Sequence, residues 1–134
     1  MSTEFNWQAR VYYEDTDAGG VVFYANYLRF MERARTEWLR SIGFEHEQLI
    51  KQHDLIFAVK SVSIDYKKPA KLDDLLKISS SILNHRGASI TFQQQIYNDA
   101  DELLTQAEVK VACLNATTLK ASAMPKELLT ELSK

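Results

Sequence analysis

The chain has 134 residues, a length that fits one domain with its own core, spanning residues 1–134. Hydrophobic residues make up 46% and charged residues 25%, close to the averages for soluble globular proteins, which argues against a disordered chain or a membrane protein. Lys and Arg number 16 against 18 acids, so a net charge of −2 gives no basic field for nucleic acid. Any anionic ligand must therefore be held by a local cluster of cations.

The N-terminal stretch "MSTEFNW" carries an acid and lacks the apolar core of a secretory signal, and no apolar run reaches 18 residues. We therefore expect a cytoplasmic protein with no integral membrane segment. Cys113 is the only cysteine, which excludes an internal disulfide and a thiolate metal site. Within "VACL" we expect it to be a small buried hydrophobe.

The first predicted elements are a strand and a long helix. Residues 5–13, "FNWQARVYY", are rich in aromatic and β-branched residues and predict a strand that ends at a group of acids. Residues 26–42 predict the longest helix, with Asn26 as its N-cap and Gly43 just past its end. Its apolar side chains recur at steps of four or three and predict one buried stripe: Tyr27, Met31, Ala34, Trp38 and Ile42.

The rest of the chain is mostly strands. After a short helical stretch at residues 45–53, alternating or apolar segments at 57–68, 75–86, 88–99 and 102–119 predict four strands with short connectors. Parallel neighbours would need longer crossovers, so the pattern predicts an antiparallel meander, followed by a final polar helical turn after Pro125. The expected class is α+β, a long helix wrapped by a curved antiparallel sheet of about five strands. Edge strands favour a homodimer, and dimers could assemble further into a homotetramer.

Three acids and two glycines precede the long helix, in "EDTDAGG". In an extended segment Asp15 and Asp17 would share one side. A calcium loop that starts at Asp15 fails at two ligand positions, Gly19 and Asn26. Phosphatases that form an aspartyl-phosphate also use Asp-x-Asp, but they need a parallel sheet, so that hypothesis fits poorly. From spacing alone, bonds that only shape a turn stay open for both acids.

The run "YYEDTDAGGVVFYANYLRFMERART" closely resembles the start of bacterial hotdog-fold acyl-CoA thioesterases, of the 4-hydroxybenzoyl-CoA thioesterase type and its Tol-Pal-associated relatives. The resemblance continues through "VSIDYKKPAKLDD", the turn at Arg86 and "AEVKVACLNATTLKASAMP", and so covers nearly the whole chain. It implies hydrolysis of acyl-CoA thioesters. The hotdog fold is also a long helix wrapped by an antiparallel sheet, in agreement with the pattern above.

The resemblance implies that Asp17 is the catalytic carboxylate and that the N–H of Tyr24 stabilises the oxyanion. Asp17 would act as a general base or as a nucleophile, and the sequence leaves both routes open. Many Tol-Pal-associated members carry a histidine at the position of Tyr24 in this chain. A tyrosine cannot take over the role of that histidine as a base near neutral pH. Val21, Val22 and Phe23 would form an acyl wall or belong to the core.

The coenzyme A phosphates need cations at the mouth of the site. Candidates are Lys67, Lys68 and Lys71, with Arg86 and Lys120 favoured because they could converge across a dimer interface. The expected substrate-binding residues are Gly19, Gly20, Val22, Asn26, Arg86 and Lys120. We expect no metal and no cofactor, and acyl-CoA or an acyl carrier protein as the thioester carrier. The main alternative is a hotdog domain that binds an acyl group or a partner protein without catalysis.

Overall fold

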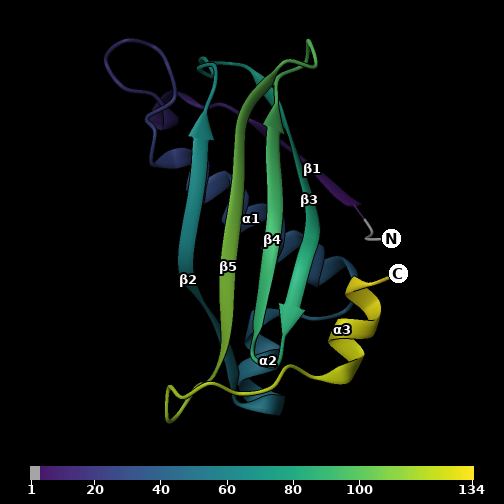
Figure 1. Cartoon of the computed structure of the whole chain (residues 1–134). Coiled ribbons are helices and arrows are strands. Elements are labelled where there is room, and N and C mark those ends of the chain that lie inside the picture. Colours follow the sequence, from purple (N-terminus) through teal and green to yellow (C-terminus); the bar gives the residue numbers. More distant parts are fainter. Residues whose placement is uncertain (1–3) are drawn as a thin grey trace.

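The computed structural model describes residues 4–134 of the chain. Within them the chain folds into three α-helices, one short 3₁₀ turn and a five-stranded antiparallel sheet (Figure 1). None of these helices is both long enough and apolar enough to cross a membrane. The elements are β1 Glu4–Arg10, the 3₁₀ turn Tyr13–Asp15, α1 Asn26–Ser41, α2 His46–His53, β2 Leu55–Tyr66, β3 Leu75–Arg86, β4 Ser89–Tyr97, β5 Leu103–Asn115 and α3 Lys126–Leu132.

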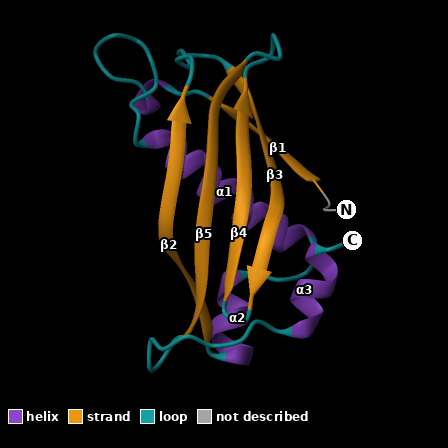
Figure 2. Ribbon diagram, viewed as in Figure 1, coloured by secondary structure: helices purple, strands orange, loops and turns teal. Residues whose placement is uncertain are grey.

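The sheet has the strand order β1-β3-β4-β5-β2, with every neighbouring pair antiparallel (Figure 2). The antiparallel pairing confirms the predicted class and excludes the parallel sheet that the phosphatase hypothesis requires. The simple meander was wrong, because β2 pairs with β5 instead of β3. The connection after β2 does not turn back as a hairpin: Ala70 accepts a hydrogen bond from the N–H of Val22 at 2.9 Å, and Lys71 bridges to Val21.

Helix α1 lies across one face of the sheet and supplies much of the core (Figure 1). The predicted stripe is buried except at its last member, Ile42, which is half-buried. Gly43 does lie just past the helix, with φ of +90°, and the N–H of Phe44 reaches back to the carbonyl of Leu39 at 2.8 Å. The predicted N-cap was wrong, because Ala25 holds that position and Asn26 is the first helical residue.

The first strand is shorter than predicted, because it ends at Arg10 and not at residue 13. The carboxylate of Asp15 accepts a hydrogen bond from the N–H of Tyr12 at 2.8 Å, which closes a 3₁₀ turn where the strand would have continued. At the other end of the chain, α3 is not simply a polar turn, since Leu128 and Leu132 are buried in the core. Cys113 is fully buried, as predicted.

Candidate active site

The loop before α1 is closed by its own backbone. The N–H of Asp17 donates to the carbonyl of Val21 at 3.0 Å, and the N–H of Gly20 donates to the carbonyl of Asp17 at 3.1 Å. Gly20 has φ of +79°, a conformation that side chains with a Cβ rarely adopt. Thr16 and Val22 bridge the two sides of the loop. Asp17 is therefore held at the start of a tight turn that returns the chain to the helix.

The two acids of the loop have different roles. Asp15 is half-buried in the 3₁₀ turn and accepts the N–H of Tyr12, so a turn-shaping role is confirmed for it. Because Asp15 is not extended, the expectation that it shares one side with Asp17 was wrong. The carboxylate of Asp17 is exposed, and its Oδ1 accepts the N–H of Gly19 at 2.9 Å. Within residues 4–134 its Oδ2 has no hydrogen-bond partner and is open to a water molecule or a substrate.

Free backbone donors precede the first turn of α1. The N–H of Phe23 donates to the carbonyl of Asp15 at 3.0 Å, and the side-chain amide of Asn26 donates to the same carbonyl at 3.0 Å. The N–H groups of Tyr24 and Ala25 make no hydrogen bond to any residue that the structure describes. Unpaired amides at the positive end of a helix attract negative charge. The Asp17 loop is therefore hydrogen-bonded to the start of α1, where the N–H groups of Tyr24 and Ala25 are available as donors.

Three tyrosines lie beside these donors. Tyr24 and Tyr66 pack edge to face with ring centres 6.3 Å apart, and Tyr27 and Tyr66 are 5.4 Å apart. The hydroxyl of Tyr27 accepts the N–H of Ala70 at 2.9 Å. Burial raises the pKa of Tyr27 and of Tyr66 above the ordinary value for tyrosine, so neither phenol is suited to act as a base near neutral pH.

The tyrosines line a groove of about 270 Å³, which we name the tyrosine groove. Phe23 and Tyr24 are exposed, whereas Val22 is buried in the core and also lines the groove. Val22 therefore belongs to the core, and its role as an acyl wall stays a prediction. The groove is formed by Val22, Tyr24, Tyr27, Tyr66, Lys67, Lys68 and Pro69.

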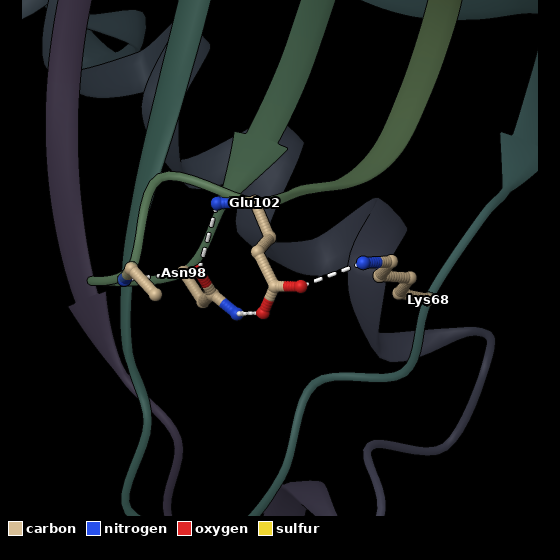
Figure 3. A network of polar contacts seen from close by, with 4 residues as sticks. Lys68, Asn98 and Glu102 are labelled. Atoms are coloured by element: carbon tan, nitrogen blue, oxygen red, sulfur yellow. Dashed lines mark hydrogen bonds and ion pairs between the residues drawn. The ribbon is translucent and has the colours of Figure 1, made fainter.

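The cations fall into two groups. Lys67 and Lys68 line the tyrosine groove, but Lys68 pairs with Glu102 at 2.6 Å (Figure 3). Arg86 at the β3–β4 turn and Lys120 after β5 are exposed and lie at the other end of the sheet from the Asp17 loop (Figure 1). Within one subunit the structure therefore does not bring the two favoured cations to Asp17.

Two residues of interest were missed from the sequence. Tyr66 was treated only as part of a strand, although it ends the alternating segment "SIDY" on the side that faces α1. Arg35 was not noted, although it follows Met31 by four residues and precedes Leu39 by four, in register with the buried stripe. That register was the available signal, because a charged residue in a buried row needs a specific partner. Within residues 4–134, no group of three or more His, Cys, Asp or Glu residues could hold a metal ion.

A helix wrapped by an antiparallel sheet, with a carboxylate and free amides at the helix start, defines a hotdog-fold protein. Comparison with known proteins agrees: residues 11–132 match the family model described as the thioesterase-like superfamily. The chain belongs to this superfamily. It is 45% identical to the acyl-CoA thioester hydrolase YbgC of Escherichia coli over 97% of this chain and 96% of that protein. It is 48% identical to the acyl-CoA thioesterase YbgC of Haemophilus influenzae, over 96% and 93%.

Solved structures show the same fold. A probable thioesterase from Bartonella henselae is 36% identical with a TM-score of 0.87, over 92% of this chain and all of that one. A 1,4-dihydroxy-2-naphthoyl-CoA thioesterase from Synechocystis has a TM-score of 0.89 over 97% and 96% of the two chains. Its identity of 24% makes that likeness one of fold alone.

Proposed function

We propose that the protein hydrolyses acyl-CoA thioesters to a free acid and CoA, with Asp17 as the catalytic carboxylate. The observation that carries this proposal is the carboxylate of Asp17, which has one oxygen held by Gly19 and the other free, on a loop tied to the start of α1. The names of the relatives with 45% and 48% identity support the reaction class.

The free amides supply the second part of the chemistry. When a nucleophile adds to the thioester carbonyl, negative charge develops on the carbonyl oxygen, and donors already in place stabilise it. The N–H of Tyr24 is the proposed donor, because the preceding N–H, that of Phe23, is taken by Asp15. The phenol of Tyr24 then contributes to the tyrosine groove and not to proton transfer.

Two balanced routes fit this arrangement. In the first, Asp17 removes a proton from water, the hydroxide adds to the carbonyl, and the tetrahedral intermediate expels the CoA thiolate, which takes the proton from Asp17. In the second, the carboxylate itself adds and expels the thiolate, leaving a mixed anhydride that water hydrolyses. Label in the Asp17 side chain after a single turnover in ¹⁸O-labelled water identifies the second route, with water attacking the aspartyl carbonyl of the anhydride; attack at the acyl carbonyl labels only the product, as the first route does.

The substrate-binding proposal follows the same loop. Gly20 permits the turn, Gly19 holds the Asp17 carboxylate, and Asn26 ties the helix start to the carbonyl of Asp15. Arg86 and Lys120 could reach a CoA phosphate only from a partner subunit, and Lys67 is the nearer candidate within one subunit. The carrier is CoA or an acyl carrier protein, since both present the acyl group as a thioester.

A dimer through β2 is part of the proposal. Strand β2 is the last strand of the sheet, so one side of its backbone has no partner strand within residues 4–134. Val59, Val62 and Tyr66 are 50%, 38% and 45% exposed, although they lie opposite Val111, Val109 and Thr105, which are buried. An unpaired edge beside exposed apolar side chains favours pairing with a second copy. A buried free thiol without a disulfide agrees with a cytoplasmic location.

The test is thiol release from short, long and aromatic acyl-CoAs in the presence of a chelator. We expect turnover of at least one thioester that the chelator does not reduce. Acyl-CoA binding without any thiol release would replace this proposal with a non-catalytic binding domain.

A further inference from the structure

A buried arginine faces an apolar cavity in the other half of α1. Arg35 is only 9% exposed, and it lies nine residues after the first residue of the helix, which is about 13 Å along the axis. The cavity has a volume of about 190 Å³ and lies between α1, α2 and the sheet. We name it the Arg35 cavity. Most of its walls are apolar, and Thr36 and His46 add polar groups to the lining; the apolar wall residues are Leu39, Phe57, Val59, Ile90, Phe92 and Val111.

The guanidinium is held in place by a buried polar chain. Arg35 Nη1 donates to Oε1 of Gln94 at 2.9 Å. Gln94 is fully buried, and its amide nitrogen donates to the carbonyl of Met31 at 3.0 Å and to the hydroxyl of Ser80 at 2.9 Å. With all three bonds made, Gln94 has one orientation and presents its oxygen to Arg35. The arginine is thereby fixed to the sheet.

The positive charge of Arg35 is not balanced by a contact. An arginine carries five N–H donors, and within residues 4–134 only Nη1 makes a hydrogen bond. Arg35 also forms no ion pair in this part of the chain. In the described residues, Thr105 Oγ1 is the only fully buried side-chain polar atom that lacks a hydrogen-bond partner. The other nitrogens of Arg35 also lack a partner there, so they are not fully buried. The remaining donors therefore reach the open space of the cavity.

We propose that the Arg35 cavity binds the carboxylate of a small apolar or aromatic acid, with the guanidinium of Arg35 as its anchor. Planar guanidinium groups bind carboxylates through two parallel hydrogen bonds, and the apolar walls suit a short hydrocarbon body. Burial lowers the pKa of Arg35 to about 10, so it stays charged at neutral pH and gains from an anionic partner. Ligand pockets for drug-sized molecules measure roughly 300–1,000 Å³, so this cavity suits only a small group.

Glu32 sets the selectivity of this site. It lines the cavity, is exposed, and lies within Coulombic range of Arg35 without pairing with it. Its negative charge opposes an incoming carboxylate, although solvent screens part of that effect. Removing the charge of Glu32 should therefore strengthen carboxylate binding, whereas removing the charge of Arg35 should abolish it.

The carboxylate could come from a free acid or from the far end of an acyl group. The first arm of the test measures calorimetric binding of benzoate and of its neutral analogue benzamide to the intact protein, and needs no turnover. We expect benzoate to bind at least about tenfold more tightly than benzamide, which is ~1.4 kcal/mol. Arg35→Met should remove that preference, and Glu32→Gln should lower the Kd of benzoate.

Matched variants keep the result interpretable. Arg33→Met removes an exposed arginine of the same helix that does not line the cavity, and should leave benzoate binding unchanged. Should Arg35→Met fail to fold, Arg35→Lys keeps the charge but lacks the planar fork, and should weaken benzoate binding. Equal binding of benzoate and benzamide, or an unchanged benzoate Kd in the folded Arg35 variant, would overturn the proposal.

The second arm separates the two sources and rests on the proposed function. It compares kcat/KM for dodecanedioyl-CoA and dodecanoyl-CoA, which differ only in a terminal carboxylate in place of a methyl group and are long enough to span the distance along α1. A preference for the dicarboxylic thioester that Arg35→Met removes identifies the acyl group as the source of the carboxylate. Benzoate binding without that preference identifies a free acid. Absence of all turnover would contradict the proposed function. The benzoate measurement would still show whether the Arg35 cavity binds a carboxylate.

Discussion

The hydroxyl of Tyr66, at the end of β2, donates a hydrogen bond to the carbonyl of Tyr24, 3.2 Å away. Tyr24 immediately precedes the N-cap of α1 and carries the free N–H proposed as the oxyanion donor. The edge strand of the sheet is thus bonded to the residue whose backbone stabilises charge in the proposed reaction. The bond fixes the peptide unit between Tyr24 and Ala25, and so restrains the backbone next to the Tyr24 N–H from a residue 42 positions further along the chain.

Tyr66→Phe removes this bond and keeps the aromatic packing. Because a single hydrogen bond contributes about 0.5–1.5 kcal/mol, we expect kcat to fall roughly threefold to tenfold with KM little changed. Steady-state thiol release measures the effect. Tyr97→Phe is the control and should leave kcat intact, because among the described residues the Tyr97 hydroxyl is bonded only to Gln95. Equal rates for Tyr66→Phe and wild type would show that the bond does not orient the donor.

How much the sequence reveals differs between the fold and the site. Periodicity predicted β3 with its observed bounds and placed Gly43 correctly, because both depend on local pattern and backbone conformation. Periodicity did not predict that β2 pairs with β5. The connection after β2 bonds to the loop before α1, but its sequence resembles that of an ordinary turn. The link from Tyr66 to Tyr24 was invisible for the same reason, since it depends on that pairing.

The sequence named the acids of the candidate site but did not reveal the buried charge of Arg35. The spacing of Asp15 and Asp17 left their roles open, and in the structure both accept a backbone N–H: Asp15 that of Tyr12 and Asp17 that of Gly19. The register of Arg35 with the buried stripe indicated its burial, but its partner, Gln94, is 59 residues away. A contact of that kind carries no local signal.

Gln94→Leu should destabilise the protein. The change removes the acceptor for Arg35 and the donors to Met31 and Ser80, leaving a buried charge without its partner. We expect the free energy of unfolding to fall by about 2–4 kcal/mol, measured by urea denaturation. Gln93→Leu, on the neighbouring half-buried position, should change it by less than about 0.5 kcal/mol.

The double variant Arg35→Met with Gln94→Leu tests the coupling between the two residues. Replacing both members of a buried polar pair by apolar groups is often close to neutral, so the double variant should be more stable than Gln94→Leu alone. Additive losses would mean that Arg35 and Gln94 act independently.

Glu102 should titrate at low pH because of its neighbours. The hydrogen bond from Lys68 lowers the pKa of Glu102 below its ordinary value of 4.5, and the amide of Asn98 lowers it further (Figure 3). A lowered folded-state pKa stabilises the protein above pH 4.5, and that contribution disappears as the pH falls through the folded value. NMR titration should show the pKa of Glu102 rising in Lys68→Met.

Lys71→Met is the matched control for that titration. Lys71 acts on Glu102 only through a Coulombic interaction, which is the smallest contribution to the lowered pKa, so its removal should raise the pKa of Glu102 less. A larger effect from Lys71→Met than from Lys68→Met would contradict the ion pair drawn in Figure 3.

Val62→Lys should weaken the proposed dimer. The side chain lies on the edge strand, is 38% exposed, and would bring a charge into an apolar contact between copies. Light scattering with size-exclusion chromatography should show a dimer for wild type and a larger monomer fraction for the variant. Leu119→Lys, at an exposed position outside the sheet, should stay dimeric. A monomeric wild type would rule out the dimer.

The most direct test of the central claim is thiol release from the best acyl-CoA substrate by wild type, Asp17→Asn and Asp15→Asn. Asparagine at position 17 can still accept the N–H of Gly19 but cannot take a proton or attack a carbonyl. We expect kcat to fall by roughly 10²–10⁴-fold in a folded Asp17→Asn protein, while Asp15→Asn keeps most of its activity. Full activity in Asp17→Asn would show that Asp17 only shapes the loop and would contradict the account.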